Sequence, residues 1–249
     1  MIEQADALVR LPELPAEHYG CVIADPPYSS GTTHAAGRTT MKPSAKYQNS
    51  EHYGLYPEFA GDNRDQRSFT IWSERWMREA YRVTRPGGLI LCFSDWRQLP
   101  ATTDALQVAG WIWRGIAVWD KTGGARPQRG RFKAQSEFIA WGSRGHLPNE
   151  GRCAPGVFRH SVGNRKNHIT AKPAALFEDL LQLAQPPVLD PFAGGGSLGI
   201  ACKRLGLDYH GLEIDPHFAG VAMKAIEAGV AMKTIEAGVA MKAIGEAVP

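Results

Sequence analysis

The sequence predicts an α/β protein built on a mostly parallel, doubly wound sheet with an antiparallel edge strand. Short apolar runs typical of buried strands alternate with stretches of helical periodicity along most of the chain. Two of the strand-like runs follow one another without a helix between them, which predicts the antiparallel edge. The 249 residues, of which 43% are hydrophobic, are enough for one sizeable core.

Composition narrows the class of protein further. No apolar run approaches the length of a membrane span, and no basic-then-apolar leader opens the chain. The four cysteines are scattered without a C-x-x-C pair, and the eight histidines show no metal-ligand spacing. We therefore expect a cytoplasmic protein with no membrane partner and no metal site.

The first predicted strand, residues 19–24, ends at the tetrapeptide Asp25-Pro26-Pro27-Tyr28. Open α/β sheets place their chemistry at the carboxyl ends of strands. The two prolines fix the backbone and remove two donors, so the Pro26 carbonyl is a rigid acceptor. Together with the Asp25 carboxylate and the Tyr28 ring, it suits a planar base that carries an exocyclic amine. A strand followed by a simple Pro-Pro turn is the alternative.

Residues 29–68 are mostly polar, are interrupted by glycines and show no apolar stripe. A long insertion beside an active-site edge is either a mobile arm that closes over nucleic acid or plain disorder. The elements predicted after it are a helix at 69–85 stopped by Pro86-Gly87-Gly88, a strand at 89–93, a helix at 98–109, and the paired strands 111–121 and 136–141.

The segment from Lys121 to Lys172 is strongly basic, with eleven Lys or Arg residues against two Glu residues. Such a segment on an otherwise acidic chain is the expected footprint of a polyanion, and a solvated loop is the alternative. Arginine forks suit phosphates and guanine edges, and the interspersed glycines let a loop follow a groove. The candidate contacts are Lys121, Arg126, Arg129, Arg131, Lys133, Arg159, Arg165 and Lys166.

The pattern that follows is typical of a cofactor site. Its elements are a helix that begins near Pro173, the strand 188–190, a glycine turn, a helix, and the strand 209–213. The glycines also satisfy the dinucleotide fingerprint, which a nicotinamide-dependent enzyme would share. Asp190 argues against that cofactor, because a carboxylate there repels a pyrophosphate but can bind the ammonium group of S-adenosylmethionine. Phe192 could lie near the sulfonium, and Glu213 could hold ribose hydroxyls.

These motifs together resemble those of the DNA amino-methyltransferases, which methylate adenine N6 or cytosine N4. The resemblance rests on the tetrapeptide at 25–28, on Thr170-x-Lys172-Pro173, and on the strand and glycine turn that end at Gly199. It implies a Rossmann-like class I methyltransferase fold, S-adenosylmethionine as cofactor and double-stranded DNA as partner. The tetrapeptide precedes the glycine turn, which is the order of the beta group.

The resemblance also implies a set of cofactor-binding residues. They are Asp6, Asp25, Lys172, Pro173, Asp190, Pro191, Phe192, Ala193, Gly194, Gly196 and Glu213. For Asp6, which precedes a short apolar stretch, the alternative role is a helix N-cap.

A mechanism follows from the same resemblance. The target base leaves the stack, Asp25 and the Pro26 carbonyl accept hydrogen bonds from its amine, and Tyr28 stacks on the ring. Members with Asp as the first motif residue mostly act on adenine, and those with Ser mostly act on cytosine. We therefore expect a site-specific, restriction-modification type adenine N6 methyltransferase, with Asp25, Pro26, Pro27 and Tyr28 as its catalytic residues. An N4-cytosine enzyme, a non-catalytic DNA-binding protein and a nicotinamide-dependent enzyme are the alternatives.

Past Ala219 the chain is a near-exact nine-residue repeat of helix-forming composition. Nine residues turn a helix through about 900°, so successive copies face opposite sides and one copy alone can pack on the domain. The predicted organisation is a methyltransferase domain at 1–219, with an insertion at 29–68 and a basic target-recognition region at 122–167, and a tail at 220–249. The tail is either a tolerated duplication or a contact in a homodimer.

Overall fold

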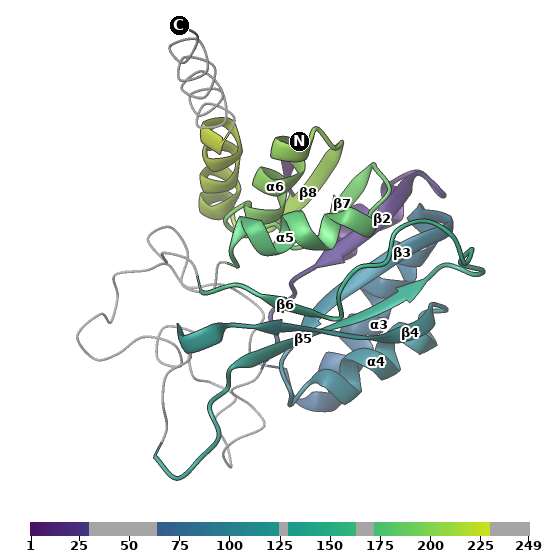
Figure 1. The fold of residues 1–249 in the computed structure, drawn as a ribbon. Coiled ribbons are helices and arrows are strands. Elements are labelled where there is room, and N and C mark those ends of the chain that lie inside the picture. Colours follow the sequence, from purple (N-terminus) through teal and green to yellow (C-terminus); the bar gives the residue numbers. More distant parts are fainter. Residues whose placement is uncertain (30–63, 125–128, 163–171, 230–249) are drawn as a thin grey trace, which may run out of the picture.

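The computed structural model describes residues 1–29, 64–124, 129–162 and 172–229, whose strands form one mixed sheet (Figure 1). The strands are β1 (Ile2–Gln4), β2 (Tyr19–Ala24), β3 (Thr84–Ser94), β4 (Ile112–Asp120), β5 (Ser136–Ser143), β6 (Val157–Arg159), β7 (Val188–Asp190) and β8 (Tyr209–Glu213). They lie in the order β1-β8-β7-β2-β3-β5-β4-β6. Every neighbouring pair is parallel except the two pairs made by β5, so the predicted α/β class is confirmed.

Helices cover both faces of the sheet, as a doubly wound fold requires (Figure 1). They are α1 (Ala7–Arg10), α3 (Gln66–Val83), α4 (Leu99–Val108), α5 (Ala174–Leu180) and α6 (Ser197–Leu205). Alternate residues of β2 point to opposite faces, so Val22 packs in one core with Trp76 of α3, and Ile23 packs in the other with Phe177 of α5. Within the described ranges, no helix is both long and apolar enough to cross a lipid bilayer.

The antiparallel strand does not lie at the predicted edge. β5 lies between β3 and β4, and the edge is formed by β6, which no sequence pattern predicted. The chain leaves β3 through α4 and enters β4 in the parallel direction, and the turn after β4 then brings β5 back into the space between them. β6 is three residues long, too short for an alternating pattern to be recognised, and β1 escaped prediction for the same reason.

The boundary between α3 and β3 also differs from the prediction. The helix ends at Val83, and the strand already includes Pro86-Gly87-Gly88, which were predicted to separate the two elements. The strand continues through them because Arg144, the residue after β5, pairs with them. The Gly87 N–H donates to the Arg144 carbonyl at 2.8 Å, and the Arg144 N–H donates to the Gly88 carbonyl at 2.9 Å. Gly87 has a φ of 79°, a conformation that glycine adopts without strain.

The predicted insertion at 29–68 lies mostly outside the described residues, but both of its ends are described. The Arg64 N–H donates to the Ser29 hydroxyl at 3.2 Å, so the chain leaves and returns at one place beside the end of β2. The last three residues of the predicted insertion form the first turn of α3, which Asp65 caps by accepting from the N–H groups of Arg67 and Ser68.

Residues 216–229 form a helix that crosses the predicted domain boundary at 219 without a break. The first repeat copy is packed on the domain: Ala222 is fully buried, and a Cβ added to Gly196, just before α6, would lie 2.9 Å from the Ala222 Cα. Residues 230–249, which hold most of the later copies, lie outside the described residues. The division into domain and tail therefore stays a prediction.

Candidate active site

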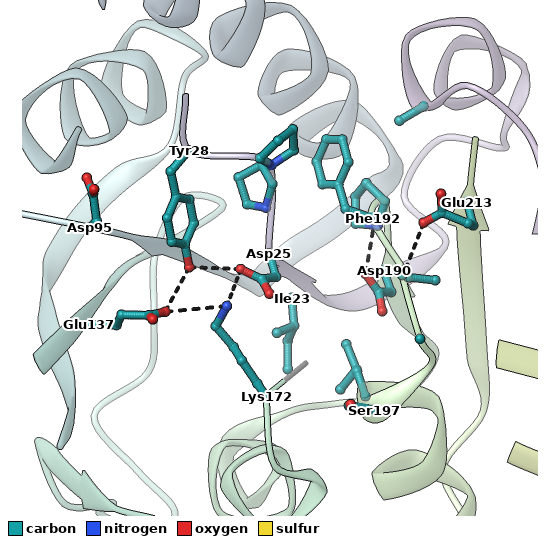
Figure 2. Close-up of a pocket in the computed structure, with 18 of the residues that line it drawn as sticks. Ile23, Asp25, Tyr28, Asp95, Glu137, Lys172, Asp190, Phe192, Ser197 and Glu213 are labelled. Carbon is teal, nitrogen blue, oxygen red and sulfur yellow. Dashed lines mark hydrogen bonds and ion pairs between the residues drawn. The ribbon is translucent and has the colours of Figure 1, made fainter. Parts of the chain in front are cut away.

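A cavity of about 530 Å³ opens at the carboxyl ends of the parallel strands (Figure 2). β2 and β7 are neighbours in the sheet, and the chain proceeds from them in opposite directions, to β3 and to β8. This is the position at which open α/β sheets bind their ligands. The predicted site residues that line the cavity are Asp6, Asp25, Pro26, Pro27, Tyr28, Lys121, Lys172, Asp190, Pro191, Phe192, Ala193, Gly194 and Glu213. Pro173 caps α5 and Gly196 caps α6, and neither is among the lining residues.

The Asp25 carboxylate uses its two oxygens differently. Oδ1 accepts the Tyr28 hydroxyl at 2.8 Å and also forms an ion pair with the Lys172 ammonium. Among the described residues, none donates a hydrogen bond to Oδ2. Asp25 therefore keeps one oxygen for internal contacts and one for a ligand that enters the cavity. Its side chain is 28% exposed, enough for such a ligand to reach it.

Glu137 of β5 is a site residue that was not among the predicted site residues. Its Oε2 lies 3.0 Å from the Tyr28 hydroxyl and 3.4 Å from Lys172 Nζ (Figure 2). Its Oε1 lies 2.8 Å from Lys121 Nζ. Burial disfavours the charged form of Glu137, but the Lys172 and Lys121 ammonium groups outweigh burial and hold the pKa of Glu137 below its ordinary value. Its signals in the sequence are its place as an acidic residue in an otherwise basic segment and the stretch Ser136-Glu137-Phe138, which also resembles the amino-methyltransferases.

Lys172, which the resemblance implies is a cofactor-binding residue, lies beside the tetrapeptide at 25–28. Its Nζ lies 5.3 Å from the centre of the Tyr28 ring and 4.7 Å from that of Phe93, and its side chain is 4% exposed. Burial alone would favour the neutral amine, but Asp25 and Glu137 reverse this and raise the pKa of Lys172 above its ordinary value. Lys172 is thus a buried ammonium group in contact with two carboxylates.

The cofactor half of the cavity has one carboxylate at the end of each of two adjacent strands. Asp190 Oδ1 accepts the Phe192 N–H at 3.1 Å, and Oδ2 accepts the Tyr209 hydroxyl at 3.0 Å. Burial raises the pKa of Asp190 to about 7, and nearby Asp25 and Glu213 act in the same direction. The Glu213 carboxylate accepts the Gly194 N–H at 2.8 Å and an N–H of the following turn, and burial raises its pKa.

This lining fits S-adenosylmethionine. Asp190 can accept the ammonium of the methionine end, and Glu213 can accept ribose hydroxyls. Phe192 forms an aromatic wall, held edge-to-face against Trp76 with ring centres 5.1 Å apart. Asp6 lines the same cavity and also accepts the Leu8 N–H at 2.9 Å, so its predicted cap is observed.

The predicted DNA contacts fall into three groups. Arg129, Arg131 and Lys133 are exposed, and Arg159 is exposed with its Nε 3.6 Å from Asp120. Lys121 is instead half-buried in the cavity wall, because its ammonium is paired with Glu137. The remaining three, Arg126, Arg165 and Lys166, lie outside the described residues.

Comparison with known proteins agrees with this geometry. The profile of the family described as DNA methylase, which covers N6 and N4 methyltransferases, matches residues 19–151 and 152–224. Type II methyltransferase M2.DpnII of Streptococcus pneumoniae is 22% identical over 252 residues, covering 91% of this chain and 89% of that protein.

Two solved structures share the fold. The complex of M1.HpyAVI with S-adenosylmethionine superposes with a TM-score of 0.60 at 19% identity, covering 90% of this chain and 97% of that one. The cytosine-N4-specific PvuII DNA methyltransferase superposes with a TM-score of 0.65 at 16% identity, covering 89% of this chain and 84% of that one. The predicted class I methyltransferase fold is thereby confirmed. The chain belongs to the DNA methylase family, the S-adenosylmethionine-dependent methyltransferases that modify adenine N6 or cytosine N4 of DNA.

Proposed function

We propose that this protein is a site-specific adenine N6 methyltransferase that acts on a base flipped out of double-stranded DNA. The observation that carries the proposal is the Asp25 carboxylate in the cavity wall, whose Oδ1 is fixed by Tyr28 and Lys172 while Oδ2 accepts no hydrogen bond from the described residues. The cofactor turn after β7 lies at the same edge of the sheet, so a bound cofactor and a bound amine would share one cavity.

The chain's own residues bind and orient the amine. A base must leave the stack to enter the cavity, at a cost of a few kcal/mol. The Asp25 carboxylate and the Pro26 carbonyl then accept the two N–H groups of the exocyclic amine. These hydrogen bonds draw the nitrogen lone pair out of conjugation with the ring, and the charged acceptor forms the stronger of the two.

When bound, S-adenosylmethionine supplies a methyl group on a positively charged sulfur. The lone pair of the amine nitrogen forms the new N–C bond, and the electrons of the broken C–S bond stay on sulfur. Asp25 accepts the proton that the nitrogen loses. The site needs no group to attack the cofactor other than the substrate, so holding amine and methyl in line supplies much of the rate enhancement.

Adenine is favoured because the first motif residue is Asp, which is the rule for adenine enzymes in the family that the motifs resemble. Cytosine N4 is the second candidate, since the same two acceptors suit an amine on either ring. The order of the motifs, with the tetrapeptide before the glycine turn, supports membership of the beta group. The exposed Arg129, Arg131 and Lys133 provide a cationic surface for the phosphates of the duplex.

Nucleoside analysis tests the base assignment. Plasmid methylated by the protein is digested to nucleosides and separated by liquid chromatography with mass detection. N6-methyladenine is the expected product. N4-methylcytosine alone would overturn the assignment to adenine and leave the mechanism standing.

A further inference from the structure

The Asp25 and Glu137 carboxylates face one another across the Tyr28 hydroxyl. The Tyr28 hydroxyl lies 2.8 Å from Asp25 Oδ1 and 3.0 Å from Glu137 Oε2, so these two oxygens are at most about 6 Å apart. The hydroxyl has a single proton and can donate to one of them at a time. Tyr28 therefore orients both carboxylates without balancing their charge.

Like charges at this separation in a water-poor site do not both persist at neutral pH unless a cation compensates them. Lys172 is placed to do so, because its Nζ contacts Asp25 Oδ1 and lies 3.4 Å from Glu137 Oε2. Lys121 compensates the other oxygen of Glu137. The result is a cluster of two carboxylates and two ammonium groups in which Lys172 alone contacts both acids.

Two more titratable groups act on Asp25 from other strands. Asp190 of β7 and Cys92 of β3 both interact electrostatically with Asp25, and burial raises the pKa of each. The buried Cys92 thiol is neutral at physiological pH, and Asp190 adds negative charge as it ionises. Neither supplies a positive charge, and within the described ranges Lys172 is the cation that forms an ion pair with Asp25.

We propose that Lys172 is a positioning residue that keeps the Asp25 carboxylate charged in the presence of Glu137 and fixes its Oδ1, so that Oδ2 accepts the substrate amine. The inference rests on the proposed function and adds to it a role for a residue expected at the cofactor. On this inference, the ammonium group of Lys172 is needed because the Glu137 carboxylate lies close to the Asp25 carboxylate. Removing Lys172 should leave the two facing carboxylates without their shared cation, so that the pair binds a proton more readily and Asp25 Oδ1 is no longer fixed.

The test compares Lys172→Met, Lys172→Arg, Glu137→Gln and the double variant Lys172→Met/Glu137→Gln with the wild type. Single-turnover methyl transfer to DNA is measured from pH 6 to 10, and the dissociation constant of S-adenosylmethionine is measured by calorimetry. Lys172→Met should lose about 100-fold in rate at pH 7, and the loss should become smaller toward pH 10, where the pair of carboxylates releases its proton. The cofactor constant should change by less than about threefold.

The matched variants separate charge from packing. Lys172→Arg should stay within about tenfold of the wild type, and the double variant should recover at least about tenfold over Lys172→Met at pH 7, since it removes the opposing carboxylate. If Lys172→Met does not fold, the double variant is compared with Glu137→Gln, and the acidic limb of the rate profile should lie at higher pH in the double variant.

Three results would overturn the inference. They are a Lys172→Met profile that is lowered equally at every pH, a large loss of cofactor binding with an unchanged profile, and a double variant no faster than Lys172→Met. A failure of the proposed function is distinguishable, because the wild type itself would then transfer no methyl group to DNA.

Discussion

Asp190→Asn should make the ligand-free protein more stable at neutral and alkaline pH while removing its response to S-adenosylmethionine. The wild-type carboxyl is 4% exposed, and its pKa is raised from 3.8 to about 7 by burial. Asparagine can keep both contacts: its oxygen accepts the Phe192 N–H, and its amide can donate to the Tyr209 oxygen. The substitution therefore changes the charge and leaves the shape.

The sign and size of the expected stability change follow from the linkage between protonation of Asp190 and folding. A raised pKa in the folded state means that protonated Asp190 stabilises the fold below about pH 4, and that this contribution is lost as the pH rises to about 7. A shift of about three pKa units at about 1.4 kcal/mol each gives about 4 kcal/mol above pH 7. Asparagine stays neutral throughout, so the variant keeps the stability that the wild type loses.

Urea unfolding at pH 5, 6, 7 and 8 measures the effect. The difference in free energy of unfolding, variant minus wild type, should grow by about 1.4 kcal/mol per pH unit and level off near pH 7. Added S-adenosylmethionine should raise the melting temperature of the wild type and not that of the variant. A variant that is no more stable than the wild type at pH 8 would refute the reasoning.

Two further perturbations test the DNA surface and the glycine turn. Replacing Arg129 and Arg131 with Gln should weaken DNA binding and reduce the slope of log affinity against log salt concentration by about 0.9 for each phosphate that is no longer neutralised. Filter binding at several salt concentrations measures this slope, and an unchanged slope would mean that both arginines face solvent and do not contact DNA. Gly196→Ala should destabilise the protein by at least about 1–2 kcal/mol, because Gly196 has a φ of 82° and the added Cβ would press on the Ala222 backbone. Chemical unfolding measures the change in stability, and an unaltered midpoint would contradict the packing of the first repeat copy on α6.

The parts of the fold and site that could be predicted are those with a local signal. β2 and β8 were predicted with the bounds that the structure shows, because an apolar run and its flanking residues determine each of them. The tetrapeptide after β2 and the glycine turn after β7 likewise lie at the predicted edge of the sheet. That they face one cavity followed from the rule that parallel strands end at one edge.

The parts that could not be predicted depend on which strands are neighbours. Glu137 and Lys172 meet only because β5 lies beside β3, and no spacing in the sequence reports that order. Lys121, expected as a surface cation, is a partner of Glu137 because the register of the β4–β5 pair places Trp119 opposite Glu137, and this register was not predicted. The strand order also extended β3 through Pro86-Gly87-Gly88, where local turn chemistry predicted a break.

Transfer of a labelled methyl group tests the central claim most directly. Unmodified plasmid is incubated with S-adenosylmethionine that carries a deuterated methyl group, together with the wild type or Asp25→Asn, and the nucleosides are analysed by mass spectrometry. Asparagine keeps the size of Asp25 but removes the charged acceptor, and calorimetry confirms that the variant is folded and binds the cofactor. We expect deuterated N6-methyladenine with the wild type and at least about 100-fold less with the variant. Equal labelling by the two proteins, or no labelled base from a wild type that binds the cofactor, would contradict the account.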